Sequence, residues 1–159
     1  ERAERIAASE RYIPEFLSIK TAIDNSRLNQ TLNTPAIATL FLLGEQITWM
    51  NDNGGLGWAA ARTKAASDHL YEWAEKSSFA TPFVSNTEHR SQVVVTIDFD
   101  ESVDAAAVAK TLRANGIVDV EPYRKLGRNQ LRVATFAATD KHEVEQLTSA
   151  IDFVVEQLG

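Results

Sequence analysis

Cysteine is absent from the 159-residue chain, which excludes a disulfide framework, a thiol nucleophile and any zinc site built on thiolates. The same absence fits a reducing compartment, so we expect a cytoplasmic protein. No stretch approaches the roughly 18 consecutive apolar residues of a membrane span. The N-terminus has neither a secretory signal pattern nor a transit-peptide pattern, and we therefore expect neither membrane insertion nor secretion.

Basic residues are fewer than acidic ones, 16 against 22, which gives a net charge of −6. This balance argues against general nucleic-acid binding. Positive charge is concentrated in residues 121–132, called the cationic segment here. The charges of this segment sum to +3, so the rest of the chain carries −9. The cations of this segment are Arg124, Lys125, Arg128 and Arg132. Such a segment can bind an anion, although a solvated turn or salt bridges to neighbouring carboxylates would also account for it.

The first third of the chain contains one well-marked helix. Residues 10–34 have no sustained period and should form a long irregular connection. Thr34 is a good N-cap, Pro35 is favoured at the first helical position, and apolar residues follow at helical spacing up to the turn signals at 51–55. A second helix is predicted from about residue 57 to residue 76, followed by a loop to residue 89.

The rest of the chain predicts an α/β protein of the α+β type. The predicted elements are a strand at 92–99, a helix from Asp104 to Asn115-Gly116, strands at 117–121 and 130–137, and a helix that opens at Asp140. The last helix places Val144, Leu147, Ile151, Val154 and Leu158 on one face. This order predicts a mainly antiparallel sheet with its helices packed on one face.

Arg132 is the first candidate binding residue. Alternation along strand 130–137 places Leu131, Val133 and Thr135 on one face and Arg132, Ala134 and Phe136 on the other. Burying an arginine side chain in mid-strand is unfavourable unless an anion neutralises its charge. The planar guanidinium suits a carboxylate that accepts two parallel hydrogen bonds. The alternative is an exposed edge position beside solvent.

Asn33 and Thr34 are the second candidate. They precede the predicted helix start, where unpaired backbone N–H groups and the positive end of the helix dipole favour phosphate. The alternative is that they simply cap the helix. Residues 98–101 have the composition of a metal cluster, but a strand end running into a helix cap explains them better, and the three histidines are scattered. We therefore expect no metal site.

Residues 29–40 and 121–132 closely resemble the matching segments of bacterial-type phosphoserine aminotransferases. The similarity includes residues 53–56 and 112–117 and runs from the first residue to the last, over only the C-terminal part of the family's length. The resemblance implies the aspartate-aminotransferase fold and a homodimer that uses pyridoxal 5'-phosphate. It further implies that 3-phosphohydroxypyruvate and glutamate are converted to O-phosphoserine and 2-oxoglutarate in serine biosynthesis.

The resemblance assigns roles to five residues. Asn33 and Thr34 match the pair that reaches the cofactor phosphate of the neighbouring subunit, and Arg132 matches the arginine that clamps the substrate α-carboxylate. Tyr123 and Arg124 match the pair that helps to hold the substrate phosphate, although many members have histidine where Tyr123 stands. The residues before Arg132 differ from the shorter glycine-rich turn of many relatives, which leaves a phosphate contact by Arg128 open.

The resemblance also implies where this chain lies within the enzyme. Residues 1–51 would be the end of the large cofactor-binding domain and residues 52–159 the small C-terminal domain. The Schiff-base lysine would lie upstream of Glu1, because none of Lys20, Lys64, Lys76, Lys110, Lys125 and Lys141 sits in the matching motif. We therefore expect the chain alone to be inactive and to bind no cofactor. Another aminotransferase of the same fold and a stand-alone regulatory domain for a small anion are the alternatives.

Overall fold

The computed structural model describes residues 1–9, 11–123 and 125–158. The chain divides into two compact units, Glu1–Trp49 and Met50–Gly159. Arg124, one of the predicted site residues, lies outside the described residues. Within the described residues, no helix combines the length and the apolar character that crossing a bilayer requires.

The first unit contains α1 (Arg2–Ala7), the 3-10 turn η1 (Glu15–Leu17) and α2 (Ile19–Arg27). The prediction that residues 10–34 are irregular is therefore wrong for α2. The Ser18 hydroxyl caps this helix by accepting a hydrogen bond from the Thr21 N–H at 3.2 Å, and the Asn25 amide donates to the Thr21 carbonyl at 2.9 Å. Nine residues are too few to show a sustained period, and Asn25 reads as a breaker although it lies inside the last turn.

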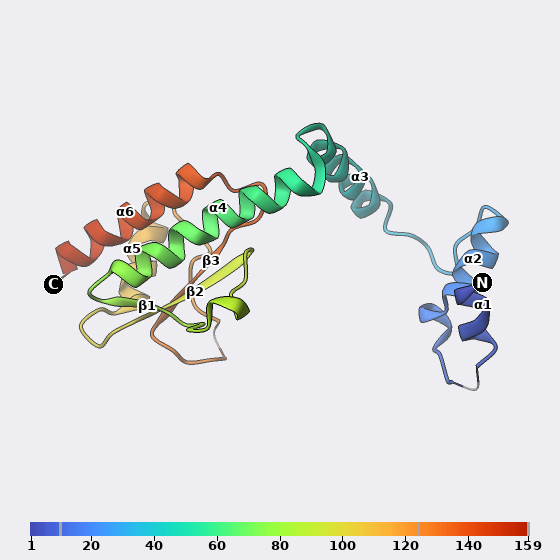
Figure 1. Ribbon diagram of the computed structural model, residues 1–159, viewed down its shortest axis with the longest axis horizontal. Coiled ribbons are helices and arrows are strands. Elements are labelled where there is room, and N and C mark those ends of the chain that lie inside the picture. Colours follow the sequence, from blue (N-terminus) through green and yellow to red (C-terminus); the bar gives the residue numbers. More distant parts are fainter. Residues whose placement is uncertain (10, 124, 159) are drawn as a thin grey trace. The chain divides into compact units, whose positions relative to one another are not determined.

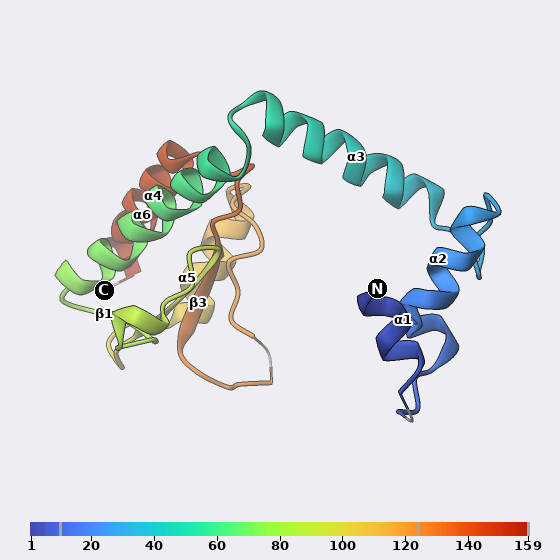
Figure 2. The same cartoon turned by 45° about the vertical axis from the view of Figure 1, so that its right-hand side comes forward.

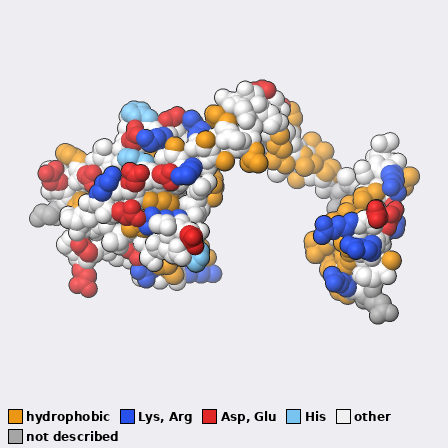
Figure 3. Space-filling view, viewed as in Figure 1, with side chains coloured by type: hydrophobic (Ala, Val, Ile, Leu, Met, Phe, Trp, Pro, Cys, Tyr) orange, Lys and Arg blue, Asp and Glu red, His pale blue; other side chains and the backbone are white. Residues whose placement is uncertain are grey.

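Helix α3 (Ile37–Asp52) begins two residues later than its sequence signals predict. The Ile37 N–H closes a tight turn onto the Pro35 carbonyl at 2.9 Å, and the Leu40 N–H makes the first helical hydrogen bond with the Ala36 carbonyl at 3.0 Å. Thr34 is therefore not the N-cap. None of the residues of α3 is buried, and hydrophobic side chains gather along it (Figure 3).

The described residues of the second unit form a three-stranded sheet together with helices α4, α5 and α6, which Figure 1 labels. Its elements are α4 (Gly55–Lys76), β1 (Ala80–Pro82), the 3-10 turn η2 (Thr87–His89), β2 (Val94–Phe99), α5 (Ala105–Ala114), β3 (Gln130–Ala134) and α6 (Lys141–Leu158). Both strand pairs are antiparallel and the strand order is β1-β2-β3, which confirms the predicted mainly antiparallel sheet. Helices α4 and α6 lie side by side in two views of the molecule (Figure 1, Figure 2).

Two strand predictions are wrong. Strand β1 lies in the predicted loop at 77–89. It has only three residues, one of them Pro82, which is too few to show alternation. The strand predicted at 117–121 does not form, because Asp119 adopts the left-handed conformation with φ 65° and interrupts the extended backbone. A hydrogen bond of 3.0 Å from the Arg132 N–H to the Val120 carbonyl still brings this segment against β3.

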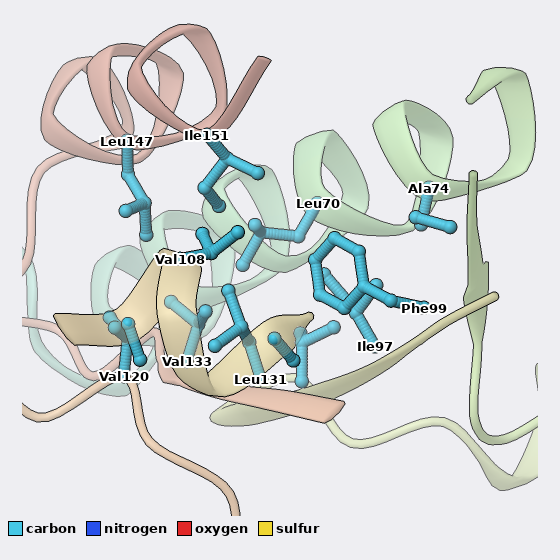
Figure 4. Close-up of a cluster of buried hydrophobic side chains, with 14 of the residues drawn as sticks. Leu70, Ala74, Ile97, Phe99, Val108, Val120, Leu131, Val133, Leu147 and Ile151 are labelled. Atoms are coloured by element: carbon cyan, nitrogen blue, oxygen red, sulfur yellow. The ribbon is translucent and has the colours of Figure 1, made fainter. Parts of the chain in front are cut away.

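The core lies between the helices and one face of the sheet. Leu70 of α4, Val108 of α5 and Ile151 of α6 point toward Leu131 and the other inward residues of the strands (Figure 4). The predicted inward residues of β3 are buried, whereas Phe136 on the other face is 54% exposed. Leu158 was predicted to share the buried face of α6, but it is 55% exposed because it lies at the last helical residue, beyond the buried Val154.

The helix caps of this unit follow the sequence signals. The Asp104 carboxylate accepts hydrogen bonds from the N–H groups of Ala106 and Ala107, at 2.9 and 3.2 Å, and so starts α5. Asp140 and Glu143 form a capping box, in which the Glu143 carboxylate accepts from the Asp140 N–H at 2.9 Å. These caps fix where α5 and α6 begin relative to the strands that precede them.

We predict that Leu70→Ala lowers the free energy of unfolding of the second unit by about 2 to 5 kcal/mol, because it opens a cavity in the core. Leu158→Ala is the matched control, since it removes the same atoms from an exposed helical site and should change stability by about 0.5 kcal/mol or less. Hydrogen exchange of the β2 and β3 amides measures both effects within this unit. Equal losses from the two substitutions would contradict the assigned core.

Candidate anion-binding site

Arg132 lies in the middle of β3 on the sheet face opposite the helices. The register pairs it with Thr96 of β2, while its neighbours Leu131 and Val133 turn into the core. Strand β3 is the last strand of the sheet, as the edge alternative requires, but the Val120 segment lies against it and Arg132 is partly buried. The predicted strand phase is therefore confirmed.

Tyr123 and Arg132 come together, as expected if they serve one site. The Arg132 Cζ atom lies 6.0 Å from the centre of the Tyr123 ring, a distance at which a cation is attracted to an aromatic face. Tyr123 is 55% exposed, so the pair is open to solvent. Among the described residues, no carboxylate forms an ion pair with the Arg132 guanidinium, whereas Arg113 pairs with two carboxylates and Arg128 with one.

Asp98 is the carboxylate nearest to Arg132 along the sheet, and Arg128 already holds it. Asp98 pairs with Gln130 in the register, so it is the diagonal neighbour of Arg132 on the same face. Arg128 donates to Asp98 through both Nε, at 3.1 Å, and a terminal nitrogen, at 2.5 Å, and Gln130 donates a further hydrogen bond at 2.8 Å. The pairing raises the pKa of Arg128 and leaves Asp98 little capacity for another cation.

A pocket of about 380 Å³ opens beside Arg132. Among the described residues it is lined by Arg113, Asp119, Glu121, Pro122 and Arg132. The Arg113 Nε donates to Glu121 Oε1 at 2.5 Å, and a terminal nitrogen of Arg113 donates to Asp119 Oδ1 at 3.2 Å. The hydrogen bond from Arg113 lowers the pKa of Glu121, so this carboxylate is ionised at neutral pH. Of the two arginines that line the pocket among the described residues, Arg132 is the one without a carboxylate partner there, which suits an anionic ligand.

Asn129 fixes the end of the loop that precedes β3. Its side-chain amide donates to the carbonyls of Phe99, Asp100 and Val103 at 3.2, 2.9 and 2.7 Å, and its Oδ1 accepts from the Ala105 N–H at 2.9 Å. Gly127 turns the chain just before it, with φ 65°. Sequence reasoning missed this role, because the partners are backbone groups that leave no side-chain pattern.

The arginines of the cationic segment therefore differ in their surroundings. Arg128 has its carboxylate and also lies 4.9 Å from the centre of the Phe83 ring, which accounts for it without a ligand. Asp98 and Asp100 also have ordinary partners, since Asp98 holds Arg128 and Asp100 accepts hydrogen bonds from Ser102. In the described part of the chain, no group of three potential metal ligands comes together.

Asn33 and Thr34 lie in the first unit, just before α3. Both are exposed, and the Asn33 carbonyl accepts a hydrogen bond of 2.7 Å from the Thr31 hydroxyl. A side-chain amide and a hydroxyl are suitable donors for phosphate oxygens, although the later helix start removes the capping argument for Thr34. This pair belongs to the first unit, whereas Arg132 belongs to the second.

Residues 15–120 of the chain match the family described as "Aminotransferase class-V". The phosphoserine aminotransferase of Rhodococcus opacus strain B4 is 62% identical over 159 residues, which are 100% of this chain and 43% of that protein. The chain thus spans about two fifths of the length of the curated relatives it matches.

Solved structures show the same fold. A phosphoserine aminotransferase from Bacillus circulans subsp. alkalophilus superimposes with a TM-score of 0.81 at 24% identity, covering 99% of this chain and 42% of that one. A PLP-bound phosphoserine aminotransferase from Trichomonas vaginalis gives a TM-score of 0.75 at 17% identity, covering 90% of this chain and 39% of that one. These structures match the mixed helical and antiparallel architecture, and the family match covers more than half of the chain. The chain therefore belongs to the class-V aminotransferase family.

Proposed function

We propose that these residues are the C-terminal part of a cytoplasmic phosphoserine aminotransferase. The enzyme converts 3-phosphohydroxypyruvate and glutamate to O-phosphoserine and 2-oxoglutarate in serine biosynthesis. The observation that carries the proposal is the half-buried Arg132 guanidinium, which has no carboxylate partner among the described residues of a chain 62% identical to a phosphoserine aminotransferase. Residues 1–51 belong to the large domain in this proposal, and residues 52–159 form the small domain.

Arg132 binds the α-carboxylate that both amino-acid substrates share. Its planar fork matches a carboxylate through two parallel hydrogen bonds, and its position in a strand holds the fork still. The Tyr123 ring lies beside this guanidinium, 6.0 Å from its Cζ atom. Tyr123 and Arg124 together bind the substrate phosphate, and the pairing of Arg128 with Asp98 favours Arg124 over Arg128 for this role.

Asn33 and Thr34 hold the phosphate of pyridoxal 5'-phosphate bound in the neighbouring subunit of a homodimer. Their exposed amide and hydroxyl groups supply neutral donors that fit a phosphate without adding charge. The bound cofactor supplies the electron sink for amino transfer. The lysine that carries it belongs to the rest of the enzyme in this proposal, so this chain contributes substrate binding rather than the chemical step.

Replacing Arg132 tests the carboxylate clamp. In the full-length enzyme, Arg132→Ala should lose about 2 to 4 kcal/mol of transition-state binding, which is roughly a thirty- to thousandfold fall in kcat/KM. Arg132→Lys should recover only part of this, because it restores the charge but not the fork. Lys110→Ala, which removes a cation from the exposed side of α5, should change kcat/KM by less than about twofold. A loss below tenfold for Arg132→Ala would contradict the clamp.

Replacing Arg124 tests whether the substrate carries a phosphate. Arg124→Gln should lower kcat/KM for O-phosphoserine at least about tenfold, because hydrogen bonds between charged groups contribute roughly 1.5 to 3 kcal/mol. The slower half-reaction with unphosphorylated serine is the internal control and should be unchanged. Lys125→Gln removes the neighbouring charge and is the matched variant.

Two outcomes would point to other functions. If Arg124→Gln leaves the reaction with O-phosphoserine unchanged and a phosphate-free amino acid is the better substrate, the enzyme is another aminotransferase of the same fold. If the 159-residue chain alone binds O-phosphoserine tightly in calorimetry, it is a regulatory domain for a small anion.

A further inference from the structure

Glu121 is a potential competitor for the carboxylate that Arg132 is proposed to bind. Both side chains line the same pocket, and the hydrogen bond of 3.0 Å from the Arg132 N–H to the Val120 carbonyl brings the residue before Glu121 against β3. Glu121 is partly exposed, and both side chains are long. A carboxylate attached this close to a cation has an effective concentration of the order of millimolar or more, comparable to that of a free substrate.

In the structure, Glu121 forms its ion pair with Arg113. This arginine lies in the last turn of α5, where the helix holds its backbone, and its Nε donates to Glu121 Oε1 at 2.5 Å. A terminal nitrogen of the same guanidinium binds Asp119 at 3.2 Å, so Arg113 gathers both acids of the pocket. Among the described residues, Arg113 is the cation that pairs with Glu121, while Arg132 pairs with neither acid.

We propose that Arg113 is a positioning residue that withholds Glu121 from Arg132 and so keeps the Arg132 guanidinium available for the substrate carboxylate. The inference rests on the proposed function, because it gives Arg113 a role only if Arg132 binds substrate. When Arg113 is removed, Glu121 turns to Arg132, and the substrate must displace it. The consequence is weaker substrate binding with little change in the rate of the bound complex.

A structural tether would behave differently. If Arg113 acted only by fastening residues 119–121 to α5, then removing Glu121 would break the same tether and weaken binding as much as removing Arg113. If Arg113 withholds a competitor, removing Glu121 does no harm, and removing both residues restores binding. The double variant therefore separates the two explanations.

The kinetic experiment uses the full-length enzyme with its cofactor and O-phosphoserine. Arg113→Gln should raise KM roughly three- to fivefold, as expected for competition by one partly exposed ion pair, and change kcat less than about twofold. Arg113→Gln combined with Glu121→Gln should return KM to within about twofold of the wild type, and Glu121→Gln alone should not raise it. Arg113→Gln with Asp119→Asn should not restore KM, and Lys110→Gln controls for the loss of one charge from α5.

A second measurement on the 159-residue chain does not depend on activity. The Nε–H resonance of Arg132 in NMR spectra should shift in Arg113→Gln, because Glu121 then forms an ion pair with Arg132. It should return in the double variant with Glu121→Gln, because the glutamine carries no charge to pair with Arg132. An unshifted Arg132 resonance, or a KM that the double variant leaves raised, would overturn the inference. If the resonance shifts as expected but Arg132→Ala leaves kcat/KM unchanged, the ion-pair exchange stands and the proposed function fails.

Discussion

The pairing of β2 with β3 is the constraint on which the site depends. Its register sets Thr96 opposite Arg132 and Ile97 opposite Leu131, so one face of the ribbon enters the core and the other carries the charges. A slip of one residue would turn Arg132 into the core and Leu131 outward, which would place an unpaired charge among apolar side chains. Burial of the apolar face therefore fixes the sheet face on which the arginine side chain lies.

Around Arg132, the arrangement of ion pairs decides which cation is available to bind an anion. Arg128 binds Asp98 through two nitrogens, and Arg113 binds both Glu121 and Asp119. Exposed ion pairs of this kind contribute little to stability, usually about 1 kcal/mol or less. Their effect here is selective: they satisfy the acids near Arg132 and leave its donors for a ligand. An arginine with its own protein carboxylate would have to lose that partner before it could bind another.

Much of the second unit could be predicted from local patterns. The alternation of Leu131, Arg132 and Val133 gave the correct faces of β3, and the side chains of Asp104 and Asp140 gave the correct helix starts, because these signals act over a few residues. Strand β1 could not be predicted, since three residues carry no period and their conformation is set by pairing with β2. The start of α3 was predicted two residues early, because the Ile37 N–H turns back onto Pro35.

The charge partners of the site were beyond sequence reasoning. Arg113 and Glu121 are eight residues apart, and Arg128 and Asp98 are thirty apart, so their pairing depends on where α5 and the strands are placed. Composition showed four cations in residues 121–132, but it could not show that Arg128 has a carboxylate partner and that Arg132 has none among the described residues. The resemblance to a family suggested the clamp residue, and the contacts provide a physical reason why that residue can act as one.

The net charge of −6 does not oppose anion binding at this site, because charge acts locally in salt solution. Exposed charges more than about 8 Å apart are largely screened at physiological ionic strength. Asp119 and Glu121 line the pocket with Arg132, and Asp98 is its diagonal neighbour on the sheet, so these acids are close enough to affect a ligand there. Each of the three accepts a hydrogen bond from an arginine. The sign of the potential that a ligand meets is thus set by a few paired side chains rather than by the composition of the chain.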